Sequence, residues 1–212
     1  MPCKDAAGFV LLSDVVPHIV QEIRYFSTFN FVGDRVDGYE EPVALMTRDA
    51  ARALKTVSNE VMAMGYRLKV YDAYRPVSAV KHFIFWAIED EDTRMKPYFY
   101  PGIDKQETFA LGYIAKQSSH SRGSAVDLTL LDMKSGTELD MGGPFDLFDE
   151  RSHPDFRGVT DEQYANRMLL RSAMERNGFE PYECEWWHFR LADEPFPDTY
   201  FNFPVARSSV KA

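Results

Sequence analysis

The sequence contains few cysteines, with only Cys3 and Cys184 in 212 residues. A small fold stapled by disulfides needs several cysteines at regular spacing, so that class of secreted protein is excluded. Cys3 lies close to the N-terminus, and we expect it not to pair with Cys184. Such cysteine usage is typical of a protein from a reducing compartment.

A long hydrophobic run is also absent. No window approaches the roughly 18 to 20 apolar residues that a membrane-spanning helix requires. The first residues, MPCKDAAGFVLLSDVV, contain one lysine and no apolar run of secretory length before Asp14, so they do not resemble a signal peptide. We therefore expect a soluble, cytoplasmic protein that does not act at a membrane.

Basic residues are outnumbered by acidic ones, 24 against 33, which gives a net charge of -9 at pH 7. Proteins that bind nucleic acid need basic patches to neutralise phosphates, and anionic membrane surfaces attract polybasic segments. The charge therefore argues against both kinds of partner. It does not fix the oligomeric state.

Apolar residues are plentiful, with 45% hydrophobic and 14% aromatic content. This composition supports one sizeable core, and the length fits one domain. There is no internal repeat and no low-complexity segment. We expect residues 1–212 to form a single compact domain.

Three segments have the periodicity of amphipathic helices. Residues 47–65 repeat apolar side chains at helical spacing behind Thr47, a plausible N-cap. A second helix is expected to begin at Pro76 or Ser78. The third covers residues 160–178, where the opening TDEQ has the capping-box pattern and a glycine follows the end.

Three other segments are expected to be strands, namely residues 66–76, 124–133 and 182–191. Helices and strands are interleaved, but the strands are few and compatible with hairpins. This pattern favours an α+β fold with a central antiparallel sheet flanked by helices. Residues 89–103 are expected to form an ordered loop, because the aromatic residues 98–100 need burial.

The stretch SSHSRGSAVD, residues 118–127, contains a candidate metal site. On a straight strand His120 and Asp127 would point to opposite faces, because side-chain direction repeats every two residues. Gly123 between them permits the turn that would bring them together. Zinc hydrolases use three protein ligands, commonly histidine nitrogens and a carboxylate oxygen, and leave a fourth position for water.

The stretch EWWHF supplies the remaining candidates. His188 is the expected third ligand, and Glu185 is a candidate general base for a water activated by the metal. Because the two residues are three apart, they can face one cavity only across a bulge or at a strand end. Arg75 closes the first strand, where its guanidinium could stabilise a developing oxyanion or bind a substrate carboxylate.

Each of these residues has a structural explanation when taken alone. A lone histidine more often satisfies a partly buried position, and an arginine beside a turn more often lies on the surface. His18, His82 and His153 therefore stay unassigned. The functional hypothesis depends on the joint pattern.

That joint pattern resembles a known family. SSHSRGSAVD matches the SxHxxGxAxD pattern of zinc D,D-peptidases, and EWWH matches their ExxH pattern in the same order. The chain is similar in particular to the VanX-type D-alanyl-D-alanine dipeptidases. The likeness includes VDGYE, YDAYRP, FDLFDERSH, GFEPYECEWWHF and DEPFPDTYFNFP, and it covers about residues 25–204. It implies a small α+β domain around an antiparallel sheet.

The resemblance also implies a role for each matching residue. It implies one Zn2+ per chain, bound by His120, Asp127 and His188. Glu185 matches the general base, and Arg75 matches the arginine that stabilises the tetrahedral intermediate.

Three further positions match substrate-binding groups of these dipeptidases, namely Ser118, Tyr25 and Asp146. Asp146 is expected to face the free ammonium of the substrate. The implied substrate is a small molecule, D-alanyl-D-alanine or a close D,D-dipeptide, hydrolysed to free D-alanine. Restriction to dipeptides needs a closed pocket, whose entrance the aromatic residues 98–100 could cover.

Two alternatives are left open by the sequence. One is a zinc D,D-carboxypeptidase that trims longer cell-wall peptides with the same residues. The other is a non-catalytic zinc-binding module, although a closed structural site has no use for the base Glu185.

Overall fold

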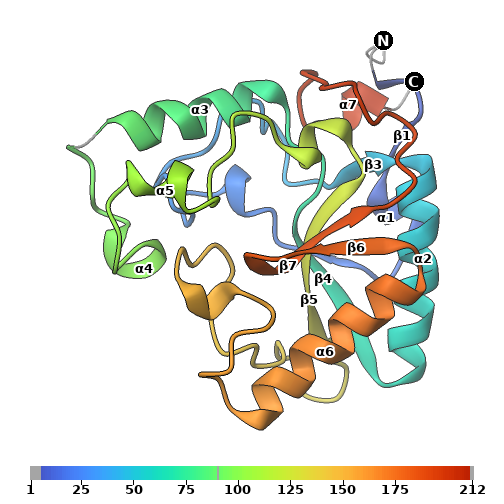
Figure 1. The fold of residues 1–212 in the computed structure, drawn as a ribbon. Helices are drawn as coiled ribbons and strands as arrows, with labels where there is room; N and C mark the ends of the chain where they lie inside the picture. The colour runs from blue at the N-terminus through green and yellow to red at the C-terminus, as the bar shows by residue number, and fades with distance from the viewer. Residues whose placement is uncertain (1–5, 90, 211–212) are drawn as a thin grey trace.

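The computed structural model describes residues 6–89 and 91–210 of the chain (Figure 1). The strands are β1 (Phe9–Leu11), β2 (Val20–Gln21), β3 (Leu45–Thr47), β4 (Tyr66–Asp72), β5 (Ala125–Asp132), β6 (Phe179–Tyr182) and β7 (Glu185–Leu191). The α-helices are α1 (Leu12–Val15), α2 (Arg48–Ala63), α3 (Val77–Ile88), α4 (Lys96–Phe99), α5 (Glu107–Ala110), α6 (Asp161–Arg176) and α7 (Arg207–Val210). Short 3-10 helices are η2 (Arg24–Phe26), η3 (Ser119–Arg122) and η4 (Glu150–Ser152).

The main sheet has five strands in the order β2-β4-β5-β7-β6. Neighbouring strands are antiparallel except for the short edge strand β2, which pairs parallel with β4. A separate antiparallel pair joins β1 to β3. The α+β prediction is confirmed, with the addition of one parallel edge pair. This pair arises because the chain passes through β3 and α2 before it returns as β4.

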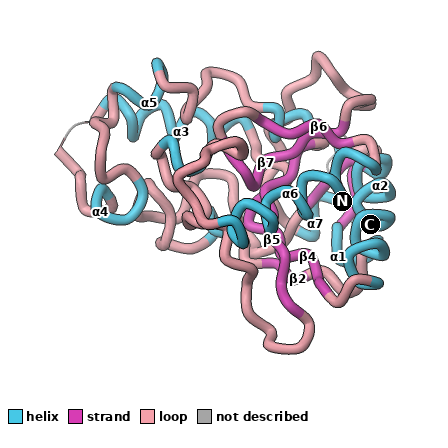
Figure 2. The backbone as a smooth tube through the Cα atoms, turned by 60° about the horizontal axis from the view of Figure 1, so that its bottom comes forward, coloured by secondary structure: helices cyan, strands magenta, loops and turns pink. Residues whose placement is uncertain are grey.

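The two long helices α2 and α6 lie together on one side of the sheet, whereas α3, α4 and α5 lie on the other side (Figure 1). Figure 2 shows that the region around α3, α4 and α5 consists largely of loops, while the strands gather beside α2 and α6. The central strands are therefore covered by regular helices on one side. On the other side, loops from distant parts of the chain can approach them.

Helix α2 begins directly after Thr47, as predicted, and buries Leu54, Val57 and Val61 completely. Thr47 occupies the N-cap position, but its side chain does not cap the helix. Its hydroxyl instead bonds the hydroxyl of Ser124 at 2.8 Å, which ties the start of α2 to the start of β5. The helix prediction is confirmed and the side-chain cap is wrong, because a tertiary partner competes for the hydroxyl.

Helix α6 has the capping box that its sequence predicts. The Thr160 hydroxyl accepts a hydrogen bond from the Gln163 backbone, and the Gln163 side chain accepts one from the Thr160 backbone. Helix α3 begins at Val77, between the two predicted positions, with Pro76 at its N-cap.

Two expectations about irregular segments need correction. Residues 182–191 are not one strand: they contain the last residue of β6, a turn at residues 183–184 and then β7, which pairs with β6 as a hairpin. In the loop of residues 89–103, Phe99 and Tyr100 are buried as expected, but Tyr98 is 58% exposed. The segment also contains the one-turn helix α4.

Cys184 is a free thiol, and Cys3 lies outside the described residues. Within residues 6–89 and 91–210, no helix is both long enough and apolar enough to cross a membrane.

Candidate active site

Three central strands place carboxylate and imidazole groups in one row across the sheet. Asp127 on β5 lies directly opposite His188 on β7, and on its other side it lies opposite Asp72 at the end of β4. Directly opposed residues of antiparallel strands point to the same face, with Cβ atoms about 5 Å apart. The register of β5 with its neighbours therefore brings Asp127 and His188 together.

His120 reaches the same face through a turn. It lies in η3, immediately before β5, and Gly123 between them has a φ of +82°. A Cβ atom at Gly123 would lie 2.1 Å from the Phe9 ring, so both the backbone conformation and the space require glycine. The expected turn at this glycine is present.

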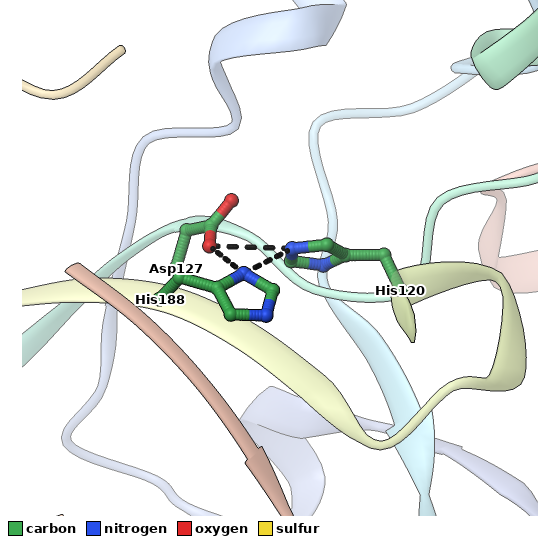
Figure 3. A group of neighbouring side chains, drawn as sticks. All are labelled: His120, Asp127 and His188. Carbon is green, nitrogen blue, oxygen red and sulfur yellow. Dashed lines mark hydrogen bonds and ion pairs between the residues drawn. The ribbon is translucent and has the colours of Figure 1, made fainter. Parts of the chain in front are cut away.

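The three side chains converge on a common point (Figure 3). His120 Nε2 lies 3.0 Å from His188 Nδ1 and 3.2 Å from an oxygen of Asp127, which is 3.0 Å from His188 Nδ1. Donors placed about 2.0 to 2.1 Å from a tetrahedral metal are about 3.3 Å apart. The triangle formed by His120, Asp127 and His188 therefore has the size that one divalent cation needs.

The outer nitrogen of each imidazole has its own partner. His120 Nδ1 lies 2.6 Å from the carbonyl oxygen of Ala73, so it carries the proton and leaves Nε2 with a free lone pair. His188 Nε2 lies 3.2 Å from the hydroxyl of Ser119. Partners of this kind orient metal-binding histidines and fix their tautomers.

Asp127 is buried, which by itself would raise its pKa. The imidazoles of His120 and His188 outweigh burial and lower the pKa of Asp127 below its usual range. The carboxylate therefore stays ionised, as a metal ligand must be.

Glu185 begins β7, where the register with β6 shifts between Pro181 and Tyr182. The irregularity lets Glu185 and His188 face one cavity despite their odd spacing, and a Glu185 oxygen lies 3.9 Å from His188 Nδ1. Burial raises the pKa of Glu185 to about 8, and the negative charges of Asp127 and Asp146 act in the same direction. A carboxyl group with this pKa can exchange a proton near neutral pH.

Arg75 is largely buried at the site, with 13% of its side chain exposed. Its Nε donates a hydrogen bond to Asp72 at 2.9 Å, and one Nη lies 3.4 Å from the outer oxygen of Asp127. The guanidinium carbon also lies 4.9 Å from the Tyr25 ring centre and 5.1 Å from that of Phe83. The fork is therefore held between two acidic groups and two aromatic rings.

Asp146 and Tyr25 form a second buried pair. The Tyr25 hydroxyl contacts both carboxylate oxygens of Asp146, at 2.9 and 3.1 Å. Burial raises the pKa of Asp146 to about 8, and the charge of Asp127 adds to this shift. Asp146 also has a φ of +63°, the one positive φ among the described non-glycine residues.

All eight residues that the sequence singled out line one cavity of about 220 Å³. These residues are Tyr25, Arg75, Ser118, His120, Asp127, Asp146, Glu185 and His188. Part of the remaining wall comes from residues 112–117, where Tyr113 stacks on Phe148 at 5.1 Å and the Tyr182 hydroxyl donates to the Gly112 carbonyl at 3.1 Å. Residues 98–100 do not line the cavity, so their expected place at the entrance is wrong.

Some residues of the site were missed by sequence reasoning. Asp72 supports Arg75, and the Tyr39 hydroxyl donates to Asp72 at 2.6 Å. A signal for Asp72 was available, because a carboxylate inside the strand YRLKVYD, three residues before Arg75, needs a buried partner. The contacts of Tyr39 and of the Ala73 carbonyl depend on the tertiary fold and have no local signal.

A triangle of two imidazoles and a carboxylate, beside a second buried carboxyl group in a small cavity, is typical of metal-dependent hydrolases. A model of the D-ala-D-ala dipeptidase family matches residues 5–206, and the chain belongs to this peptidase family. Curated D-alanyl-D-alanine dipeptidases of Enterococcus faecalis and Enterococcus faecium are 44% and 43% identical to it, over 94% and 93% of this chain and 98% of each relative. That of Streptomyces coelicolor is 42% identical, over 93% of this chain and 98% of the relative.

Proposed function

We propose that this protein is a zinc-dependent dipeptidase that hydrolyses D-alanyl-D-alanine to two molecules of D-alanine. The observation that carries the proposal is the donor triangle, which has the size of a tetrahedral site and shares a cavity with Glu185. Family membership and the names of the relatives, which match almost the whole chain, support the substrate.

The residues fit a bound zinc ion. His120 Nε2, His188 Nδ1 and one oxygen of Asp127 would hold it, and two nitrogens with one oxygen are a common ligand set in catalytic zinc sites. When bound there, a zinc ion activates water and polarises the scissile carbonyl.

Side chains of the protein transfer the proton of the attacking water and stabilise the charge on the carbonyl oxygen. Glu185 accepts a proton from the attacking water and delivers it to the nitrogen of the leaving amine. Arg75 lines the same cavity and stabilises the negative charge that develops on the carbonyl oxygen. The contact with Asp72 holds the guanidinium in place for this role.

The substrate is bound by groups on the other walls of the cavity. Asp146 binds the free ammonium group, and Tyr25 orients the Asp146 carboxylate. Ser118 also lines the cavity and contributes a hydroxyl group to substrate binding. A volume of about 220 Å³ is below the roughly 300 Å³ at which pockets for drug-sized ligands begin, so it favours a dipeptide over a longer peptide.

The proposal includes a single domain over residues 1–212 and a cytoplasmic location. One hydrophobic core that includes residues from Ala6 to Val205 supports the single domain. Fractionation of cells followed by immunodetection tests the location.

The decisive experiment compares substrates. Purified protein is assayed on D-Ala-D-Ala, on L-Ala-L-Ala and on a pentapeptide that ends in D-Ala-D-Ala, each with and without a chelator. We expect hydrolysis of the D,D-dipeptide alone, loss of activity with the chelator and recovery with Zn2+. Preferential cleavage of the pentapeptide would instead assign a carboxypeptidase, and metal-loaded protein inert towards all three would assign a non-catalytic module.

A further inference from the structure

The segment of residues 141–153, named here the Asp146 loop, supplies both Asp146 and Phe148 to the cavity. Asp146 holds a left-handed backbone conformation that non-glycine residues avoid. Such a conformation persists only where the surrounding structure fixes it. We therefore expect the Asp146 loop to be held by contacts along its length, in addition to the Tyr25 hydroxyl inside the cavity.

The Phe148 backbone N–H donates to the Phe99 carbonyl at 2.7 Å, and three further contacts come from Arg167 of α6. Its Nε donates to the carbonyl of Met141 at 2.5 Å, and its two Nη groups donate to the carbonyls of His153 at 2.9 Å and Arg151 at 2.7 Å. One side chain therefore binds the first residue of the Asp146 loop and two residues at its end. Asp146 lies between these anchor points.

Arg167 is unusual in its surroundings. Its side chain is 1% exposed, and none of the ion pairs formed by described residues includes it. Burial lowers the pKa of Arg167 to about 10, so it remains a cation at neutral pH. Burying a cation carries a desolvation cost, which the three hydrogen bonds to backbone carbonyls offset.

The same face of α6 also holds the residue that precedes the Asp146 loop. The Gln163 amide donates to the side chain of Asp140 at 2.8 Å, and the Asn166 amide donates to its backbone carbonyl at 2.9 Å. Three residues of α6 thus fix the path of the chain into the Asp146 loop and out of it.

We propose that Arg167 is a positioning residue for recognition of the substrate's amino group, which it controls by holding Asp146 in the cavity. The proposal rests on the proposed function, in which Asp146 binds the ammonium. Arg167 does not touch the substrate, and its effect reaches the cavity through the backbone of the Asp146 loop. The metal ligands and Glu185 lie on other segments, so Arg167 does not hold them in place.

The kinetic test uses Arg167→Lys, which keeps the charge but cannot reach three carbonyls with one planar group. We expect KM for D-Ala-D-Ala to rise by about tenfold or more, the factor that loss of a charged hydrogen bond produces. We expect kcat to stay within about threefold and zinc content to be unchanged. Arg171→Lys is the matched control on the same helix, because Arg171 is partly exposed and pairs with Glu175 and Asp155; its KM should not change.

A double-mutant cycle separates positioning from general destabilisation. In an Asp146→Asn background the ammonium has already lost its counter-charge, so Arg167→Lys should raise KM little further. Equal factors in the two backgrounds would overturn the proposal. So would a fall in melting temperature with unchanged KM in Arg167→Lys alone.

A measurement that does not depend on catalysis distinguishes failure of this proposal from failure of the proposed function. Hydrogen exchange of the zinc-loaded protein should become faster in residues 141–153 of Arg167→Lys, with β5 and β7 unchanged. Unchanged exchange in the Asp146 loop would overturn the proposal even if the protein cleaves D-Ala-D-Ala. If Arg167→Lys does not fold, Arg167→Gln takes its place, because it puts no charge in the buried position and keeps one amide donor; an unchanged KM in that variant would contradict the proposal.

Discussion

The carboxylate of Asp72 accepts a hydrogen bond from Arg75 Nε at 2.9 Å, and this contact links the end of β4 to the candidate active site. The other oxygen of Asp72 accepts the Tyr39 hydroxyl at 2.6 Å. Both Asp72 and Tyr39 are almost fully buried. Arg75 is therefore held at its Nε by Asp72, while one of its Nη atoms lies 3.4 Å from Asp127 at the cavity.

Asp72→Asn should lower kcat by about ten- to a hundredfold, because it removes the charge from one hydrogen bond to a buried guanidinium. The measurement is a double-mutant cycle with Arg75→Ala under saturating D-Ala-D-Ala. If Asp72 acts through Arg75, the substitution at Asp72 changes kcat little once Arg75 is absent. Additive effects would contradict this relationship, and Tyr39→Phe should give a smaller decrease than Asp72→Asn.

Arg75→Ala should lower kcat by about two to three powers of ten with zinc retained, since removing one donor to an oxyanion typically has this effect. Arg75→Lys should recover only part of the loss, because lysine cannot bind Asp72 and the substrate with one rigid group. Steady-state kinetics with metal analysis of each variant checks both statements. A decrease in kcat that follows the loss of zinc would argue against a role in charge stabilisation.

Glu185→Gln should abolish nearly all hydrolysis and leave the zinc content unchanged. Glutamine keeps the size of the side chain but cannot accept the proton of the attacking water. Elemental analysis and a stopped assay with high enzyme concentration measure the two properties separately. Near wild-type turnover in this variant would remove Glu185 from the mechanism.

The sequence predicts those parts of the fold that local patterns control. The apolar spacing and the capping box predict α2 and α6, and Gly123 predicts the turn that returns His120 to the strand that carries Asp127. Contacts between strands cannot be predicted from such local patterns. The register that sets Asp127 against His188 depends on strand order, which the periodicity of either strand does not contain.

Contacts between side chains that are distant in the sequence are equally difficult to predict from local patterns. Tyr39 and Asp72 are 33 residues apart, and Arg167 binds carbonyls from 14 to 26 residues away. Tyr98 was expected to be buried with Phe99 and Tyr100, but these neighbours face different environments. Burial of individual aromatic residues in a loop is decided by tertiary packing, which composition does not specify.

His120→Ala and Asp127→Ala should each lose the metal, because two remaining donors bind zinc much more weakly than three. Zinc content of the purified variants, measured by elemental analysis, is the direct test. Added Zn2+ should raise the melting temperature of the wild-type protein but not that of these variants, since only a bound ligand stabilises the folded state. His18→Ala is the control, because His18 is an exposed histidine outside the cavity and its loss should leave zinc binding intact.

Asp146 should make stability depend on pH in a direction opposite to that of most carboxylates. Its pKa is about 8 in the folded protein and about 4 in an unfolded chain, so between these values the folded state binds the additional proton. The contribution of Asp146 to stability is therefore lost as pH rises from about 4 to about 8. Asparagine cannot titrate, so the melting temperature of Asp146→Asn relative to wild type should be higher at pH 8.5 than at pH 5.5.

The comparison is made on chelated protein, since a bound cation would favour the ionised carboxylate and reduce the effect. Asp198→Asn, which removes one exposed carboxylate outside the cavity, controls for the change in net charge. A difference between Asp146→Asn and wild type that stays constant across this pH range would mean that Asp146 is ionised throughout. The Tyr25 hydroxyl and nearby Arg75, both of which lower the pKa of Asp146, would then outweigh its burial.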